Sequence, residues 1–218
     1  MAFSVVIPLA PGEDMHPPLL AALAALPAGC EVIVAGAKPP AAKLKGERFV
    51  KAAGPGRARA LNAGAAAAAN DWLWFLHADS RVGPEHFELL AAAAAEGGEA
   101  LRYFRLRFFD GGLPHRLSAA GAAMRSVLFK APFGDQGFFV PRSLHERLGG
   151  YREDAPYGED HLYARAAARA GVPLRMLPAA VGTSARRHLE AGWLRLTLRY
   201  QWLWISQALR DAPRRGEG

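Results

Sequence analysis

Cysteine is nearly absent from this sequence, since Cys30 is the only one among 218 residues. A single thiol excludes an intramolecular disulfide and a zinc site built from several thiolates. No uninterrupted apolar run approaches the roughly 18 residues that a transmembrane helix needs. The N-terminal residues also lack a basic lead and a cleavage site typical of a signal peptide. We therefore expect a cytoplasmic protein without a membrane span.

The charge is unbalanced toward the basic side, with a net value of +7. Such an excess favours anionic partners, namely phosphates, nucleic acid or an acidic membrane surface. Ordinary solvation of an arginine- and alanine-rich surface would give the same charge. Because aromatic and basic residues do not interleave on a recognisable reading surface, we expect no nucleic acid partner.

Buried strands and helices alternate through the first half of the chain. Apolar runs predict strands at 3–8, 31–35, 48–51 and 72–77, and helices are predicted at 17–26, 57–69 and 84–96. We expect Pro8 to end the first strand, because proline cannot donate to a central ladder. This alternation is typical of a mostly parallel, doubly wound sheet.

The pattern changes after residue 100. Residues 102–109 alternate between apolar and polar side chains, which predicts a half-exposed strand antiparallel to the others. The remaining expected elements are helices at 115–129, 143–148 and 159–170 and a short strand at 137–141. Neither a repeat nor a linker divides the chain, so we expect a single domain over residues 1–192.

Polar side chains follow the buried strand at 72–77. His77 and Asp79 stand where the strand leaves the core, and open α/β sheets bind ligands beyond the carboxyl ends of their strands. A carboxylate beside an imidazole can hold a divalent cation at such a place. The alternative is that Asp79 and Ser80 only form a turn before the next helix.

Two glycine-rich segments are further candidates for ligand contact. The segment at 54–64 opens a helix, so its backbone N–H groups and Arg57 can face an anion. The sequence Gly-Asp-Gln-Gly at 134–137 lets the backbone approach a ligand closely. Each of these segments can equally be a structural turn.

Charged residues gather in two more segments. Glu159 and Asp160 begin a predicted helix, where one carboxylate can act as a general base or both can serve only as helix caps. The basic segment at 183–188 can hold phosphates and a metal. Its alternative is a solvated loop.

Taken in order, these segments resemble the family 2 glycosyltransferases of the GT-A fold. The sequence is most similar to a bacterial subgroup described as radical-SAM/selenodomain-associated transferases. The similar segments are Val5–Pro8, Gly56–Gly64, Phe75–Asp79, Gly134–Gly137, Gly149–Tyr151, Glu159–Asp160 and Thr183–Arg187. The resemblance implies an α/β fold of the GT-A (nucleotide-diphospho-sugar transferase) type, with a mostly parallel central sheet, one antiparallel strand and flanking helices.

The resemblance also implies an activity: metal-dependent, inverting transfer of a sugar from a nucleotide-diphospho-sugar to a hydroxyl acceptor. Asp79 matches the metal-binding acid of the family's Asp-x-Asp motif, His77 replaces its first acid, and His188 stands where a late histidine ligand is common. Asp160 matches the catalytic base and Glu159 its neighbour. The implied donor-binding residues are Arg57, Asn62, Ala78, Asp79, Gly134, Asp135, Gln136 and Arg186. The implied cofactor is Mn²⁺ or Mg²⁺, and an imidazole ligand favours manganese.

Two departures from the family pattern keep other functions open. Residues 35–38 lack the acid that commonly recognises the nucleotide base, and His77 leaves the metal motif with a single carboxylate. Both departures favour a non-catalytic nucleotide- or membrane-binding protein of this fold. A nucleotidyltransferase is a further alternative, although residues 9–14 match poorly the glycine-rich loop that such enzymes carry after the first strand.

Residues 193–210 predict an amphipathic helix, which together with the tail forms a C-terminal segment at 193–218. Arg195, Arg199, Ser206 and Arg210 share one narrow stripe, while tryptophan and leucine cover most of the remaining surface. Three interpretations are open: docking onto the domain, a homodimer interface, or a peripheral membrane helix that brings the enzyme to a lipid-linked acceptor.

Overall fold

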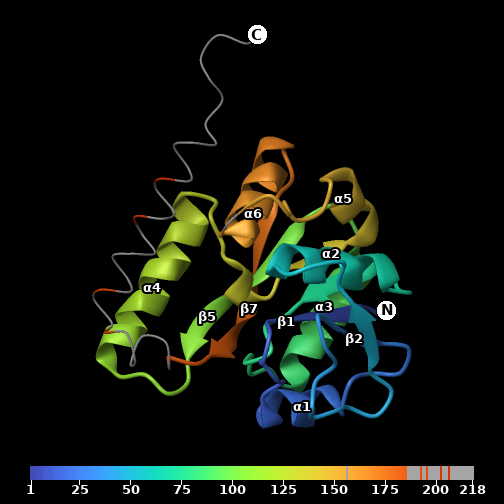
Figure 1. Ribbon diagram of the computed structural model, residues 1–218. Coiled ribbons are helices and arrows are strands. Elements are labelled where there is room, and N and C mark those ends of the chain that lie inside the picture. The colour runs from blue at the N-terminus through green and yellow to red at the C-terminus, as the bar shows by residue number, and fades with distance from the viewer. Residues whose placement is uncertain (156, 186–191, 193–194, 196–201, 203–205, 207–218) are drawn as a thin grey trace.

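The computed structural model describes residues 1–155, 157–185, 192, 195, 202 and 206. These residues form a seven-stranded sheet with helices on both faces (Figure 1). The strands are β1 (Ser4–Leu9), β2 (Glu31–Gly36), β3 (Arg48–Lys51), β4 (Trp72–Phe75), β5 (Leu101–Phe108), β6 (Phe139–Pro141) and β7 (Leu174–Thr183). The helices are α1 (Pro17–Leu23), α2 (Arg57–Ala67), α3 (Pro84–Glu96), α4 (Leu113–Leu128), α5 (Arg142–Arg147) and α6 (Glu159–Arg169), with a 3-10 turn η1 (Gly134–Gln136).

The strand order is β3-β2-β1-β4-β6-β5-β7. β6 runs antiparallel to its neighbours β4 and β5, and the other pairings among the described strands are parallel. This confirms a mostly parallel sheet with one antiparallel strand. The prediction that residues 102–109 form the reversed strand was wrong, because β5 runs parallel to β7 and the reversed strand is β6. Only the second half of β5 is half-exposed, where Arg105 and Arg107 face solvent.

Successive residues of β1 face two separate core layers. Val5 and Ile7 pack with residues of α1 and α3, whereas Val6 packs with residues of α2, α5 and α6. Figure 1 shows these two groups of helices on opposite faces of the sheet. Trp74 of β4 is fully buried in the first layer, with its ring against Phe87. The apolar run of β4 is therefore held inside the sheet, and the chain emerges from the core only after Leu76.

The first strand extends one residue beyond its predicted end. β1 continues to Leu9, and Pro8 lies opposite Ala35 of β2. Because the pairing of β1 with β4 stops at Val6, the missing N–H of Pro8 falls beyond that ladder and breaks no hydrogen bond in it. The prediction that Pro8 ends the strand was wrong for this reason.

No sequence pattern predicts β7, which is an edge strand parallel to β5. The register shifts between the Tyr103–Met176 and Arg105–Ala180 pairs, so residues 177–179 form an irregular stretch. Pro178 lies in this stretch, where its missing donor is tolerated. β7 matters for the site because its last residue, Thr183, reaches the cavity described below.

The C-terminal segment is described only in part. Arg195, Trp202 and Ser206 have helical backbone, and the rest of the helix predicted at 193–210 lies outside the described residues. Across the part of the chain that the structure describes, no helix is both long and apolar enough to cross a membrane.

Candidate active site

A cavity of about 470 Å³ lies at the carboxyl edge of the sheet. Its wall contains the ends of β1, β5 and β7, the turn after β4, and the first residues of α2 and α6. Most of the predicted site residues line this cavity: Arg57, His77, Ala78, Asp79, Asp135, Glu159 and Asp160. Segments distant in sequence thus meet at the edge where open α/β sheets bind ligands.

The turn after β4 fixes the position of Asp79. Ser80 N–H donates to the His77 carbonyl oxygen (3.1 Å), and His77 N–H donates to Ser80 Oγ (3.1 Å). Arg81 and Gly182 then exchange two backbone hydrogen bonds of 2.8 and 2.9 Å, which join the turn to β7. The stretch does form a turn, and the same turn lines the cavity.

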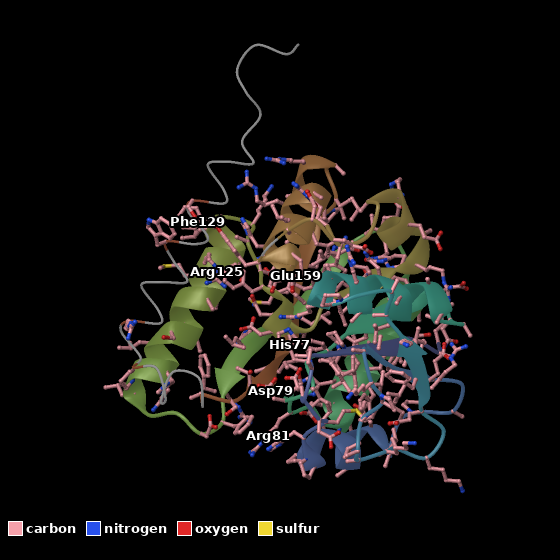
Figure 2. The ribbon with its side chains drawn as sticks, in the orientation of Figure 1. His77, Asp79, Arg81, Arg125, Phe129 and Glu159 are labelled. Carbon is pink, nitrogen blue, oxygen red and sulfur yellow. The ribbon has the colours of Figure 1, made fainter. Side chains whose placement is uncertain are left out.

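Arg57 connects the start of α2 to two other walls of the cavity. Its Nε lies 3.4 Å from Glu159 Oε1, and its Nη2 contacts His77 Nε2. Figure 2 shows Glu159, His77 and Asp79 between α4 and the N-terminal half of the sheet. The Nε2 lone pair of a neutral histidine can accept a hydrogen bond from arginine or bind a metal, but cannot do both.

Asp160 is held at the start of α6 by backbone groups. Gly134 N–H donates to Asp160 Oδ2 and His161 N–H donates to Oδ1, both at 2.7 Å. Each carboxylate oxygen keeps a second lone pair that can accept a proton. A side chain at 134 would force Asp160 or Arg57 to shift, because an added Cβ would lie 2.9 Å from Asp160 Oδ2 and 3.0 Å from Arg57 Nη2.

The two acids beside Asp160 hold their protons more tightly than usual. Burial, followed by the charge of Asp160, raises the pKa of Glu159, and Arg57 opposes the shift. Burial, again followed by Asp160, raises the pKa of Asp135 to about 6. Within the described part of the chain, the buried Oδ1 of Asp135 has no hydrogen-bond partner. A ligand hydroxyl in the cavity could supply that partner, because a buried polar atom is costly when it is unsatisfied.

Arg125 of α4 is a residue that the sequence patterns do not single out. Its guanidinium lies over the ring of Phe133, 3.6 Å from the centroid, and its Nε donates to the Ala131 carbonyl oxygen (3.1 Å). Burial lowers the pKa of Arg125, and the charges of Asp135 and Asp160 oppose the shift. Arg125 thus places a positive charge behind the acids of the cavity, and no motif in the sequence marks it.

We expect Asp135→Asn to stabilise the protein at neutral pH. Because the pKa of Asp135 is raised in the folded state, the unfolded chain releases this proton first, and the wild type loses stability between about pH 4 and pH 6. The rise of this pKa from 3.8 to about 6 corresponds to a loss of about 3 kcal/mol of stability at pH 7.5. Thermal unfolding of both proteins at pH 7.5 and pH 4 measures the difference, which should shrink at the lower pH. A variant less stable than wild type at pH 7.5 would contradict this account.

Three predicted donor-binding residues do not line the cavity. Asn62 donates to the Tyr151 carbonyl oxygen and accepts from Tyr151 N–H, both at 2.8 Å. Gln136 is fully buried and donates to the Phe104 carbonyl oxygen (3.0 Å). Gly134 contacts the site through Asp160 rather than through the cavity wall. Arg186 and His188 lie outside the described residues.

The fit of a divalent metal depends on Asp79. Within the described ranges, no group of three histidine, cysteine or acidic side chains could hold a metal by itself. Asp79 supplies the hard oxygen that Mn²⁺ or Mg²⁺ prefers. A diphosphate bound in the cavity could supply further oxygens, so the residues present fit a metal shared with a ligand.

The sequence matches the family model described as "Glycosyl transferase family 2" over residues 38–149, which is more than half of the chain. The chain belongs to glycosyl transferase family 2. The matched region contains Arg57, His77, Asp79 and Asp135, but ends before Glu159 and Asp160. Among curated proteins, none matches the sequence of this family member.

Solved structures with a similar fold include other transferases. One is a mannosyltransferase from Pyrobaculum calidifontis, PcManGT, in complex with GDP-Man and Mn²⁺. The match covers 97% of this family 2 chain and 65% of the mannosyltransferase chain, with a TM-score of 0.68 and 19% sequence identity. S. aureus TarS 1-349 in complex with UDP-GlcNAc matches 84% of this chain and 58% of its own at TM-score 0.61 and 20% identity. At such identities the likeness shows the GT-A fold alone. The chain spans about three fifths of the length of the TarS 1-349 structures.

Proposed function

We propose that this family 2 chain is a metal-dependent, inverting glycosyltransferase. It moves a sugar from a nucleotide-diphospho-sugar to a hydroxyl acceptor, and the radical-SAM-associated subgroup is the branch of the family to which we assign it. One observation carries the proposal: Arg57, Asp79 and Asp160, from three separate segments, line one cavity at the carboxyl edge of the sheet.

The placement of Asp160 supports its role as the general base. Two backbone donors fix its carboxylate, so the group is oriented before a substrate arrives. The acceptor oxygen attacks the anomeric carbon from the face opposite the diphosphate, and its proton passes to Asp160. The bond between that carbon and the diphosphate oxygen breaks, and its electron pair leaves with the diphosphate.

Arg57 and Asp79 are the groups we assign to the departing diphosphate. Arg57 lines the cavity, and its guanidinium is a planar, permanently charged donor suited to phosphate oxygens. A divalent cation on Asp79 would neutralise part of the diphosphate charge. Glu159 holds Arg57 through their ion pair, which makes Glu159 a positioning residue in this mechanism. Asp135, with its buried Oδ1, is assigned to a hydroxyl of the donor sugar or the acceptor.

Donor binding is tested by thermal-shift screening of the full chain against nucleotide sugars, with and without Mn²⁺. We expect at least one donor to raise the Tm, and to raise it further with the metal, because a ligand that binds only the folded state adds stability. The free sugar and the free nucleoside are the matched controls. Stabilisation by none of the nucleotide sugars would contradict the proposed function.

A further inference from the structure

The outward side of α4 carries exposed apolar side chains. Apart from Met1 and Trp202, the strongly exposed large apolar residues in the described part of the chain all lie between residues 113 and 129. Five of them form what we call the outer face of α4: Leu113 (66% exposed), Leu117 (60%), Met124 (59%), Val127 (56%) and Leu128 (66%). At helical spacing they share about one third of the circumference. An exposed apolar surface of this kind marks an interaction site.

The opposite side of α4 faces the active site. Ser126 is buried and donates to Gln136 Oε1 of η1 (2.9 Å), and Arg125 lies over Phe133 at the cavity wall. Figure 2 shows Arg125 between α4 and Glu159, with Phe129 at the end of the helix. The contacts of Ser126 and Arg125 on the inner side therefore hold α4 against the rest of the domain. The outer face is exposed and does not pack in the core.

The charged residues within and just after α4 are basic, and the nearest acid before the helix is Asp110, whose carboxylate accepts hydrogen bonds from Ser184 and Ala185. Residues 111–133 contain Arg116, Arg125 and Lys130 but neither aspartate nor glutamate. Arg116 and Lys130 are exposed. This surface is both apolar and cationic, so its complement is apolar and anionic.

We propose that the outer face of α4 binds the surface of an anionic lipid membrane. A second copy of the chain would oppose one basic face with another. Residues 193–210 are also a poor occupant on charge, because their sequence contains three arginines and no acid. A helix of 16 residues with basic residues beside an apolar stripe suits the headgroup boundary, where apolar burial and attraction to acidic lipids act together. The inference concerns α4 and does not depend on catalysis.

Vesicle co-sedimentation of the full chain tests the proposal. We expect wild type to pellet with phosphatidylcholine vesicles containing phosphatidylglycerol, and much less with phosphatidylcholine alone or at high salt. The substitutions Leu117→Glu, Met124→Glu and Leu128→Glu together should lower binding by about tenfold or more. A charge-matched control adds the same three glutamates at exposed alanines on α2 and α3, as Ala66→Glu, Ala92→Glu and Ala95→Glu, and should retain most of the binding.

A milder variant covers the case in which the triple variant misfolds. Leu117→Cys in a Cys30→Ser background carries an environment-sensitive dye, whose emission should shift to the blue when acidic vesicles are added. The proposal is overturned by an unshifted dye, or by a folded triple variant that pellets like wild type. It is also overturned if Trp202→Ala alone removes vesicle binding, or if the outer face forms a dimer interface and the dimer does not bind vesicles.

Discussion

Replacing Asp160 by asparagine is expected to lower the kcat of sugar transfer by about 10²–10⁴-fold. The amide cannot take the proton of the acceptor hydroxyl, whereas Arg57 and Asp79 remain in place to bind the donor. Donor affinity should therefore change little. Initial rates of transfer or donor hydrolysis, combined with donor titration by calorimetry, separate the two effects.

The control for this variant is Asp154→Asn. Asp154 is an exposed acid that pairs with Arg152 near its own position in sequence, so its loss should leave turnover and donor binding unchanged. If Asp160→Asn kept wild-type turnover while remaining folded, a different group would have to serve as the base. Its buried neighbours Asp135 and Glu159 would then be the residues to substitute.

The second large effect is expected at Asp79. Asp79→Asn should weaken donor binding in the presence of Mn²⁺ on the order of 100-fold, because Asp79 is the carboxylate that would hold the metal, and an amide is a weaker, uncharged ligand. In the absence of metal, wild type and variant should bind the donor almost equally. Calorimetric titration of the donor with and without Mn²⁺ measures both quantities.

His77→Ala provides the comparison for Asp79→Asn. The imidazole Nε2 contacts Arg57, so its loss should affect the orientation of that arginine more than the binding of metal. We expect a smaller loss of Mn²⁺-dependent affinity than for Asp79→Asn. Equal losses for the two variants would instead make His77 a metal ligand and would require Arg57 to move away from it.

The elements that sequence patterns predict well are those with strong local signals. Residues 84–96 carry a proline at the start and a glycine after the end, and α3 has these bounds. β7 lacks such a signal because Pro178 and small alanines interrupt its pattern, and pairing with β5 decides its conformation. β6 lies between β4 and β5 and runs antiparallel to both, so β5 has the same direction as β4. This order of strands is a nonlocal feature that the pattern within β5 does not carry.

The site residues likewise divide into those that the sequence predicts and those that only the structure reveals. Asp79 lies in the turn after β4 and Asp160 in the first turn of α6, and it is the resemblance to the family 2 glycosyltransferases that predicts a shared site for them. Asn62 and Gln136 look equally suited to a ligand in sequence, yet their amides satisfy buried backbone groups. Arg125 is the reverse case. Its sequence neighbours suggest no role at the site, yet its guanidinium lies over Phe133 at the cavity wall. Which polar groups serve the core and which serve the cavity is decided by tertiary packing.

The central claim is that this cavity cleaves a nucleotide-diphospho-sugar with Asp160 as the base. The most direct measurement is the release of nucleoside diphosphate from the donor that the thermal-shift screen identifies, with Mn²⁺ present, by wild type and by Asp160→Asn. The account predicts metal-dependent release by wild type and a rate lower by about 10²-fold or more for the variant. Equal rates for the two proteins, or no release by a wild type that still binds the nucleotide, would contradict it.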